Sequence, residues 1–523
     1  MKVKKVLYIV HESGLGGANR SLIDYLHVVD KLVCPIVVLP SNGPAEVRLR
    51  QLGIRYFVIP FKNGYGRIGE YSERDIACNF IDNYEAAKQL ASVVELEGID
   101  IIHSNSSVIN VGAMASAMTN VPHIWHVREF MEEDFGWEHW DKDLKKRLLS
   151  CTSEVVSISD AVRIDFEGKY GFESCRIYDG IDVKCTDKNL KQDNNSFLFA
   201  GSISENKGQM DAVLAMNELV KSGGDAKLYI IGNGNAQVKW VIKRFIKYNG
   251  LEKNIELIAY CDDLSEWRER CAFSITGSKM EALGRVTVEA MADGLIPIGT
   301  DMGGTAELIG EDGGRGFLYE YGNYYQLAQK MISAINLSTE DKRAITFRMK
   351  KYVKDTFCTN EYARKLNEVY DRIALKDVKN DERLELHKYL KERYLSLRTK
   401  YTPKVGDERN YSILRKQIKQ KLTIIIEYCK ENDIKKVAIY GMGDVGCALY
   451  DAFDVNGIRI VGVMDRSQKY LGIVVNVIKL GDDLKDVDCV FVTTIKDELK
   501  MVEQLRQTYS VRVFGVLSLC EGK

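Results

Sequence analysis

Short apolar runs alternate with helix-like stretches along most of the chain. The first half contains the strand candidates KVLYIV, CPIVVLP, DIIHSN and EVVSIS, separated by stretches such as ANRSLIDYLHVV and NYEAAKQLASVVELEG. A second series runs from FLFAGSI to GFLY, and a third begins at VAIYGMGDVG. Strands that alternate with helices are typical of parallel sheets covered on both faces. The pattern therefore predicts an α/β protein with three units, each built on a parallel sheet.

The limits of these series divide the chain into five predicted segments. They are an N-terminal Rossmann-like domain (1–184), a second Rossmann-like domain (197–358), a closing helix (359–375), a charged helical linker (376–430) and a small Rossmann-like domain (431–523).

Two connecting stretches interrupt the α/β pattern. The polar stretch KCTDKNLKQDNNS, residues 184–196, is predicted to join the two large domains without regular structure. The stretch DERLELHKYLKERYLSLRTKY has leucines at 386, 390 and 397 on one helical stripe. A solvated connector, a short coiled coil and a docking helix all fit that stripe.

Charge and cysteine content exclude several classes of protein. Lys and Arg total 73 against 74 Asp and Glu, so nothing predicts nucleic acid as the main partner. The 12 cysteines form no CxxC pair, and no signal peptide is predicted in MKVKKVLYIV. No apolar stretch approaches the roughly 18 residues of a spanning helix. We expect a cytoplasmic protein with reduced thiols, and peripheral contact with the inner face of the membrane stays open.

The stretch SKMEALGRVTVEAMADG, residues 278–294, places two carboxylates around a predicted helix start. Glu281 precedes a helix that is expected to begin near Gly284 or Arg285, and Glu289 lies inside it. The unpaired N–H groups of that helix start suit a phosphate, and Arg285 adds a forked donor. A sugar nucleotide fits this spacing, since its diphosphate lies between a hydroxyl-rich sugar and a ribose. Ordinary surface charge on a helix explains the spacing equally well.

Three neighbouring loops also follow strands and precede helices. GSISENKGQ carries Lys207, whose charge can pair with a diphosphate, and IIGNGN brings glycines that let a base or ribose approach the backbone. DMGGTAEL supplies another Gly-Gly turn. Open α/β sheets bind ligands at the carboxyl ends of their strands, where all of these loops begin.

The order of these motifs resembles the family-4 retaining glycosyltransferases of the GT-B fold, in which two Rossmann-like domains face a cleft. The matching segments are GLGGANRSL, IYDGID, GSISENKGQ, IIGNGN and EALGRVTVE with its extension AMADGLIPIGTDMGGTAELI, within residues 1 to about 375. The resemblance implies transfer of a hexosyl or N-acetylhexosaminyl group from a nucleoside-diphosphate sugar to a glycan or lipid-linked acceptor. It implies surface polysaccharide biosynthesis, with the acceptor on the first domain and the donor on the second.

The resemblance also implies roles for single residues. Glu281 would hold hydroxyls of the donor sugar, Lys207 would pair with the diphosphate, and His126 in IWHVRE would lie beside the reacting sugar. Ser202 stands where the family often has a basic residue, and Arg285 is expected to supply that charge. The implied donor-binding positions are Gly16, Gly17, Ser202, Gly232, Leu283, Gly284, Arg285, Val286 and Glu289, the last of them for the ribose.

No metal or cofactor is predicted beyond the donor substrate. The seven histidines form no cluster with metal-ligand spacing. For His123 an ordinary packed side chain is the better interpretation.

The third series opens with the glycine pattern GMGDVG. Gly441, Gly443 and Gly446 lie between a strand and a helix, and Asp465 closes the next strand near the spacing of a ribose carboxylate. These four residues form a candidate second nucleotide site. A degenerate module that packs or contacts a partner, including a second copy of the chain, explains the pattern equally well. Because every donor-site motif precedes residue 310, a chain cut before DERLELHKYL is expected to keep transferase chemistry.

Two rival functions remain open at this stage. A nucleotide-sugar 2-epimerase has the same architecture, but it needs acid and base groups around the sugar that the sequence does not identify. A non-catalytic scaffold that binds nucleotide sugars or partners is the other rival. Ser202 and the additional domain keep it open, whereas Glu281, Glu289 and Lys207 count against it.

Overall fold

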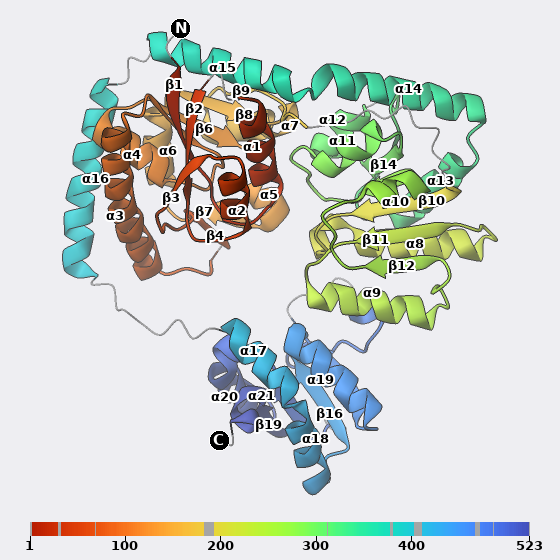
Figure 1. The fold of residues 1–523 in the computed structure, drawn as a ribbon. Helices are drawn as coiled ribbons and strands as arrows, with labels where there is room; N and C mark the ends of the chain where they lie inside the picture. Colours follow the sequence, from red (N-terminus) through yellow and green to blue (C-terminus); the bar gives the residue numbers. More distant parts are fainter. Residues whose placement is uncertain are drawn as a thin grey trace. The chain divides into compact units, whose positions relative to one another are not determined.

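The computed structural model describes residues 3–29, 33–67, 69–181, 193–310, 312–376, 380–401, 411–465, 471–484 and 486–521. The chain forms two compact units, one of Met1–Phe199 with Asp263–Lys404 and one of Ala200–Asp262 with Val405–Lys523. The predicted α/β architecture with parallel sheets is confirmed (Figure 1).

The N-terminal sheet of the first unit has seven strands in the order β3-β2-β1-β5-β6-β8-β9. All of its neighbouring strands pair in parallel, and the central strand β1 is buried over its last four residues. Burial on both faces explains why KKVLYI is almost continuously apolar. The strands are β1 (Lys4–Ile9), β2 (Val33–Leu39), β3 (Arg55–Val58), β5 (Ile101–Ser104), β6 (His123–Val127), β8 (Glu154–Ser157) and β9 (Cys175–Arg176).

Helices and a small two-stranded sheet complete this domain. The strands β4 (Tyr65–Arg67) and β7 (Trp137–His139) pair antiparallel. The helices are α1 (Gly17–Val28), α2 (Pro44–Gln51), α3 (Glu73–Glu97), α4 (Val111–Thr119), α5 (Met131–Phe135), α6 (Lys142–Ser150) and α7 (Asp160–Tyr170).

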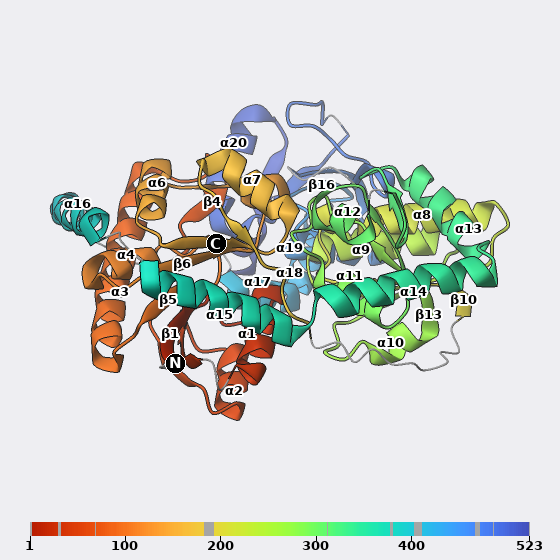
Figure 2. The ribbon, with the colours of Figure 1, turned by 90° about the horizontal axis from the view of Figure 1, so that it is seen from above.

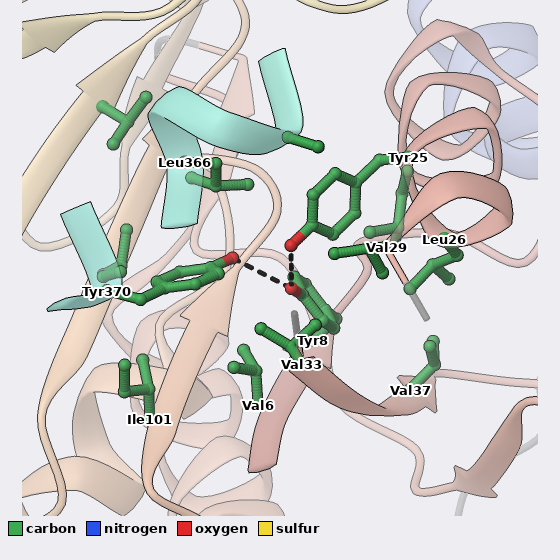
Figure 3. Close-up of a cluster of buried hydrophobic side chains, with 14 of the residues drawn as sticks. Val6, Tyr8, Tyr25, Leu26, Val29, Val33, Val37, Ile101, Leu366 and Tyr370 are labelled. Atoms are coloured by element: carbon green, nitrogen blue, oxygen red, sulfur yellow. Dashed lines mark hydrogen bonds between the residues drawn. The ribbon is translucent and has the colours of Figure 1, made fainter. Parts of the chain in front are cut away.

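A distant helix closes the core of the N-terminal domain. Helix α15 (Thr359–Lys376) packs against α1 and places Leu366 and Tyr370 in the cluster around β1. Figure 3 shows the hydroxyl of Tyr8 hydrogen-bonded to those of Tyr25 and Tyr370, with oxygen–oxygen distances of 3.0 and 2.9 Å. The partners satisfy buried hydroxyls whose desolvation would otherwise be costly.

Helix α16 (Asn380–Lys400) is a docking helix rather than a solvated connector. It packs against α3 and α4 of the N-terminal domain, beside which it lies in Figure 2. Leu386, Leu390 and Tyr394 are buried there, and Leu397 is half-buried. Arg383 is 1% exposed and donates a hydrogen bond to Ser153 Oγ at 2.7 Å. The apolar stripe therefore has a partner within the same unit.

A second sheet has the strand order β12-β11-β10-β13-β14-β15. Residues 184–192 of the predicted linker lie outside the described residues, but its last four residues belong to strand β10, so that part of the prediction was wrong. The strands are β10 (Asp193–Ala200), β11 (Lys227–Ile231), β12 (Ile255–Ile258), β13 (Cys271–Thr276), β14 (Ile296–Thr300) and β15 (Phe317–Tyr319).

Seven helices among the described residues connect or follow these strands. They are α8 (Gln209–Lys221), α9 (Ala236–Tyr248), α10 (Ser265–Arg270), α11 (Arg285–Ala292), α12 (Gly303–Ile309), α13 (Tyr324–Ile335) and α14 (Thr339–Thr356).

The C-terminal module has a parallel sheet in the order β17-β16-β18-β19. Helices α17 and α18 pack against its helices α19 and α21, so the module begins near residue 411 rather than at 431. Its elements are α17 (Tyr411–Gln420), α18 (Leu422–Glu431), β16 (Lys436–Tyr440), α19 (Asp444–Val455), β17 (Arg459–Met464), β18 (Cys489–Val492), α20 (Glu498–Thr508), β19 (Arg512–Gly515) and α21 (Val516–Cys520).

Within the second unit, α19 packs against α9. Trp240 Nε1 donates to Asp451 Oδ1 at 2.8 Å, and Arg244 pairs with Asp451 and Asp454 at 3.3 and 3.1 Å. Across the described residues, every helix is too short or too polar to span a bilayer.

Candidate functional site

The loop before α11 has the conformation that its glycine allows. Gly284 is the N-cap residue with φ of +85°, in the left-handed region that glycine adopts at low cost. Helix α11 then runs from Arg285 to Ala292, which confirms the helix predicted from the sequence. None of the described residues caps its N-terminus with a side chain, so the first N–H groups of the helix point toward the space ahead of it.

Glu281 is held in this loop from two directions. Its carboxylate accepts a hydrogen bond of 2.6 Å from Ser278 Oγ, and its carbonyl oxygen accepts one of 2.6 Å from Gly304 N. A Cβ on Gly304 would lie 2.7 Å from the carbonyl oxygen of Ala282. The Gly-Gly turn at the start of α12 therefore lets the two loops approach closely.

Glu289 lies on α11 between two guanidinium groups. Its Oε2 accepts a hydrogen bond of 3.1 Å from Arg268 Nη1, and its Oε1 lies 3.9 Å from Arg285 Nη2. Arg285 also donates to Asp24 Oδ2 at 2.7 Å and to the carbonyl oxygen of Gly180 at 3.3 Å. The arginine expected to pair with a phosphate is thus bound to α1 and to Gly180 in this structure.

The glycine loop before α1 lies close to Arg285. Gly16 is the N-cap of α1 and Gly17 its first residue, and a Cβ on Gly17 would lie 3.9 Å from Arg285 Cδ. Asn19 Nδ2 donates to the carbonyl oxygens of Glu12 and Gly14, both at 2.8 Å, which fixes the loop. Gly16, Gly17 and Arg285, which the sequence predicted as one site, therefore lie together.

His126 is fully buried on β6. Its Nδ1 lies 3.3 Å from His103 Nε2 and 3.3 Å from Arg128 Nη2. Since a guanidinium only donates, Nδ1 accepts, and the ring proton belongs on Nε2, for which the described residues provide no hydrogen-bond partner. Burial and then Arg128 lower the pKa of His126 well below its usual range, so the ring is neutral at pH 7.

His123 is an ordinary packed side chain, as predicted. It is buried on β6, with Ser104 Oγ 2.9 Å from its Nε2 and Thr152 Oγ1 3.1 Å from its Nδ1.

Leu283 and Val286 flank Gly284 and Arg285 in the first unit, whereas Lys207, Ser202 and Gly232 belong to the second unit. Lys207 ends a short 3₁₀ turn (Glu205–Lys207), and Gly208 follows it with φ of +74°. Ser202 is exposed, and its carbonyl oxygen accepts a hydrogen bond of 3.0 Å from Gln209. A Cβ on Gly232 would lie 1.9 Å from the carbonyl oxygen of Gly201, so this position excludes every side chain.

The glycine pattern of the C-terminal module has the geometry of a Rossmann turn. Gly441 has φ of +93°, and a Cβ on Gly446 would lie 1.9 Å from its carbonyl oxygen. A Cβ on Gly443 would meet open space. The carboxylate of Asp465 accepts a hydrogen bond from Met442 N, and Asp444 pairs with Lys419 at 3.1 Å.

Several contacts that the sequence did not reveal connect elements around the Glu281 loop. Ser159 Oγ, at the start of α7, donates to the carbonyl oxygen of Ala282 at 2.6 Å. Glu307 on α12 accepts hydrogen bonds from Asp160 N and Ala161 N, at 3.2 and 3.1 Å, and from the Tyr178 hydroxyl. Tyr178, Ala282 and Glu307 belong to the segments IYDGID, EALGRVTVE and DMGGTAEL, which carried a sequence signal, whereas Ser159 and Asp160 lie outside those segments.

No group of three or more histidine, cysteine or carboxylate side chains with metal-binding geometry occurs in the part of the chain that the structure describes. The charges around Glu281 and Glu289 come from side chains and helix N–H groups.

Comparison with known proteins identifies the two large domains. Residues 15–184 match the family model for Glycosyltransferase Family 4, and residues 184–351 match that for Glycosyl transferases group 1. An uncharacterized glycosyltransferase of Methanocaldococcus jannaschii is 25% identical over 298 residues, 56% of this chain and 80% of that protein. The capsular polysaccharide biosynthesis glycosyltransferase CapH of Staphylococcus aureus is 26% identical over 324 residues, 58% of this chain and 83% of CapH.

Solved structures show the same fold. A glycosyltransferase from Rickettsia africae has a TM-score of 0.59 and 20% identity, covering 72% of this chain and all of that one. Anabaena HepE, crystallised with UDP and glucose, has a TM-score of 0.57 and 20% identity, covering 71% of this chain and all of HepE. The chain therefore contains the paired domains of a GT-B glycosyltransferase, and both family models end before the C-terminal module.

Proposed function

We propose that the protein is a retaining glycosyltransferase that moves a sugar from a nucleoside-diphosphate sugar to a glycan or lipid-linked acceptor. The arrangement of Glu281, Gly284 and Glu289 carries the proposal. One carboxylate is held ahead of an uncapped helix N-terminus and another lies inside the same helix. The two carboxylates can accept hydrogen bonds from sugar and ribose hydroxyls, while the helix N-terminus between them favours a diphosphate.

The proposed roles follow from the charge that develops in the reaction. The bond between C1 of the sugar and the phosphate oxygen breaks, and the acceptor oxygen bonds to C1 on the same face. The acceptor proton passes to the departing phosphate. Lys207 and the N–H groups of α11 would stabilise the negative charge on the diphosphate, in a reaction that needs no metal ion. Glu281 would hold the sugar, and His126 would offer its Nε2 proton beside it.

The relatives support a role in surface polysaccharide biosynthesis. CapH is described as a capsular polysaccharide enzyme, and another relative, 27% identical over 259 residues, is a poly(glycerol-phosphate) α-glucosyltransferase of Bacillus subtilis. HepE was crystallised with UDP and glucose. We propose a hexosyl or N-acetylhexosaminyl donor and a cytoplasmic enzyme that meets its acceptor at the inner face of the membrane.

A panel of nucleotide sugars tests this proposal. Thermal shift should identify a stabilising donor, because ligand binding to the folded state raises stability by RT ln(1 + [L]/Kd). That donor, incubated with glycan or lipid-linked acceptors, should yield a glycosylated product and free nucleoside diphosphate. A donor that changes configuration without acceptor and without diphosphate release would favour the 2-epimerase. Binding without any reaction would favour the scaffold.

We also propose that the C-terminal module is an autonomous module for a nucleotide or a partner, with Gly441, Gly443, Gly446 and Asp465 as its candidate nucleotide site. The close approach of Gly446 to Gly441 and the open space at Gly443 support this proposal. The packing of α17 and α18 on the module's own helices supports its autonomy, although α19 also packs against α9. Titration of residues 411–523 with UDP and NAD, with binding followed by calorimetry, tests it.

A further inference from the structure

The side chain of Arg268 connects the carboxylate of Glu289 on α11 with that of Asp293, the C-cap residue of the same helix. Its Nη1 lies 3.1 Å from Glu289 Oε2, and its Nε lies 2.6 Å from Asp293 Oδ2. Glu289 and Asp293 are four residues apart on one helix face, and Arg268 reaches both from α10. Its side chain is only 15% exposed, so the guanidinium is fixed and largely shielded from solvent.

This contact holds the Oε2 oxygen of Glu289 but not its Oε1 oxygen. The described residues donate no hydrogen bond to Oε1, and its nearest cation, Arg285 Nη2, lies at 3.9 Å. Asp24 and the carbonyl oxygen of Gly180 hold Arg285 in that place. Oε1 is therefore an oriented acceptor, because Arg268 limits rotation of the carboxylate.

We propose that Arg268 is a positioning residue for the nucleotide ribose of the donor. It aims Glu289 by binding Oε2, so that Oε1 accepts a hydrogen bond from a ribose hydroxyl. The inference rests on the proposed function, in which Glu289 binds the ribose. Arg268 does not itself touch the nucleotide, so its loss should weaken recognition of the ribose hydroxyls while leaving contacts to the base and diphosphate intact.

Ribose and deoxyribose nucleotides separate this role from a merely structural one. Calorimetry on the full chain would measure Kd for UDP, ADP and GDP beside their 2′-deoxy counterparts, and the tightest-binding pair would be used for the variants. The wild-type protein should bind the ribose form about 10- to 100-fold more tightly, the range expected for hydrogen bonds to a charged group. Arg268→Gln should bring that ratio to within about 3-fold, with little change in affinity for the deoxy form.

A matched control lies on the same helix. Arg270 has a side chain that is 50% exposed and pairs with Glu266 at 3.5 Å, so Arg270→Gln should keep the wild-type ratio. Arg268→Lys keeps the charge but loses the forked pair of N–H donors, so it should also reduce the ratio of ribose to deoxyribose binding. This variant replaces Arg268→Gln in the test if Arg268→Gln does not melt cooperatively.

The outcomes distinguish the inference from the function on which it rests. A wild-type ratio that Glu289→Gln abolishes and both Arg268 variants preserve would overturn the inference alone. A wild-type ratio near one, or no binding of any of these nucleotides, would overturn the ribose role of Glu289 and the inference with it.

Discussion

Helices α11 and α19 begin alike but differ in the charges around their first turns. Each follows a glycine N-cap, Gly284 or Gly443, and neither N-terminus receives a side-chain cap. The first turn of α11 contains Arg285 and no acidic residue. The first residue of α19 is Asp444, and the adjacent Met442 N already donates to the carboxylate of Asp465.

The difference shows that a glycine pattern predicts the shape of a loop but not its ligand. An anion is favoured at a helix N-terminus that is uncapped and free of carboxylates. At α11 the Glu289 carboxylate lies beyond the first turn and accepts from Arg268, and the Glu281 carboxylate accepts from Ser278. At α19 a carboxylate lies in the first turn and pairs with Lys419. The electrostatic case for a diphosphate is therefore stronger at α11 than at α19.

The largest expected effect comes from the lysine proposed to serve the donor diphosphate. Lys207→Ala should lower kcat by about 100- to 1,000-fold, the usual cost of removing a group that stabilises charge in the transition state. The melting temperature should change little, because Lys207 is only half-buried at the end of a 3₁₀ turn. Steady-state kinetics would measure this, with Lys221→Ala, a 62% exposed side chain on α8, as control. Near-wild-type kinetics would contradict this role of Lys207 and would mean that Arg285 and the helix N-terminus stabilise the diphosphate charge without it.

A smaller effect is expected at the ribose carboxylate. Glu289→Ala should weaken binding of the cognate nucleoside diphosphate by about 1–3 kcal/mol, the cost of unpairing hydrogen bonds to a charged group. Calorimetry would measure the difference, with Glu266→Ala as a control at a 74% exposed side chain. Unchanged affinity in a folded Glu289 variant would remove this residue from the site.

At α19 the glycine pattern makes a prediction about stability. Gly446→Ala should destabilise the C-terminal module by about 1–3 kcal/mol, because its Cβ would lie 1.9 Å from the carbonyl oxygen of Gly441. Gly443→Ala should cost less than about 0.5 kcal/mol, since its Cβ meets open space and its φ is −68°. Hydrogen exchange in β16 and α19 would report both. Equal effects would mean that the glycine turn is not closely packed.

The smallest effect on donor binding is expected when the C-terminal module, which contains α19, is removed. A chain of residues 1–401 should bind nucleoside diphosphate within about 0.5 kcal/mol of the full protein, because the cut leaves the contacts of Glu281, Arg285 and Glu289 in place and separated sites usually contribute independently. The contacts that the cut removes, from Trp240 and Arg244 to Asp451, are made by α9. The cut before DERLELHKYL, near residue 378, was favoured by the sequence, but we expect the resulting chain to fold poorly. That cut removes α16 with its buried Arg383, exposes the surface of α3 and α4 that α16 covers, and takes away the hydrogen bond from Arg383 to Ser153 Oγ. Thermal melts should show cooperative unfolding of 1–401 and its loss in 1–378. Cooperative unfolding of 1–378 would contradict the proposed importance of α16 for the N-terminal domain.

The fold and the start of α11 could be predicted because they depend on local signals. Alternating apolar runs predict parallel strands, and Gly284 before an apolar-periodic stretch predicts a helix start. Arg268 could not be predicted, since it precedes Glu289 by 21 residues and carries no motif. The stripe of α16 suggested docking, but only the complementary surface of α3 and α4 distinguishes it from a connector. The burial of His126 likewise depends on its neighbours on adjacent strands.

The anomeric configuration of the first sugar released tests the proposed transfer most directly. Proton NMR would follow hydrolysis or transfer from the nucleotide sugar that best stabilises the protein, with Glu289→Ala as the impaired control. We predict that the first product keeps the anomeric configuration of the donor and appears in equal amount with the nucleoside diphosphate. An inverted anomer, or an epimerised donor without diphosphate release, would contradict the proposal that this protein is a retaining glycosyltransferase.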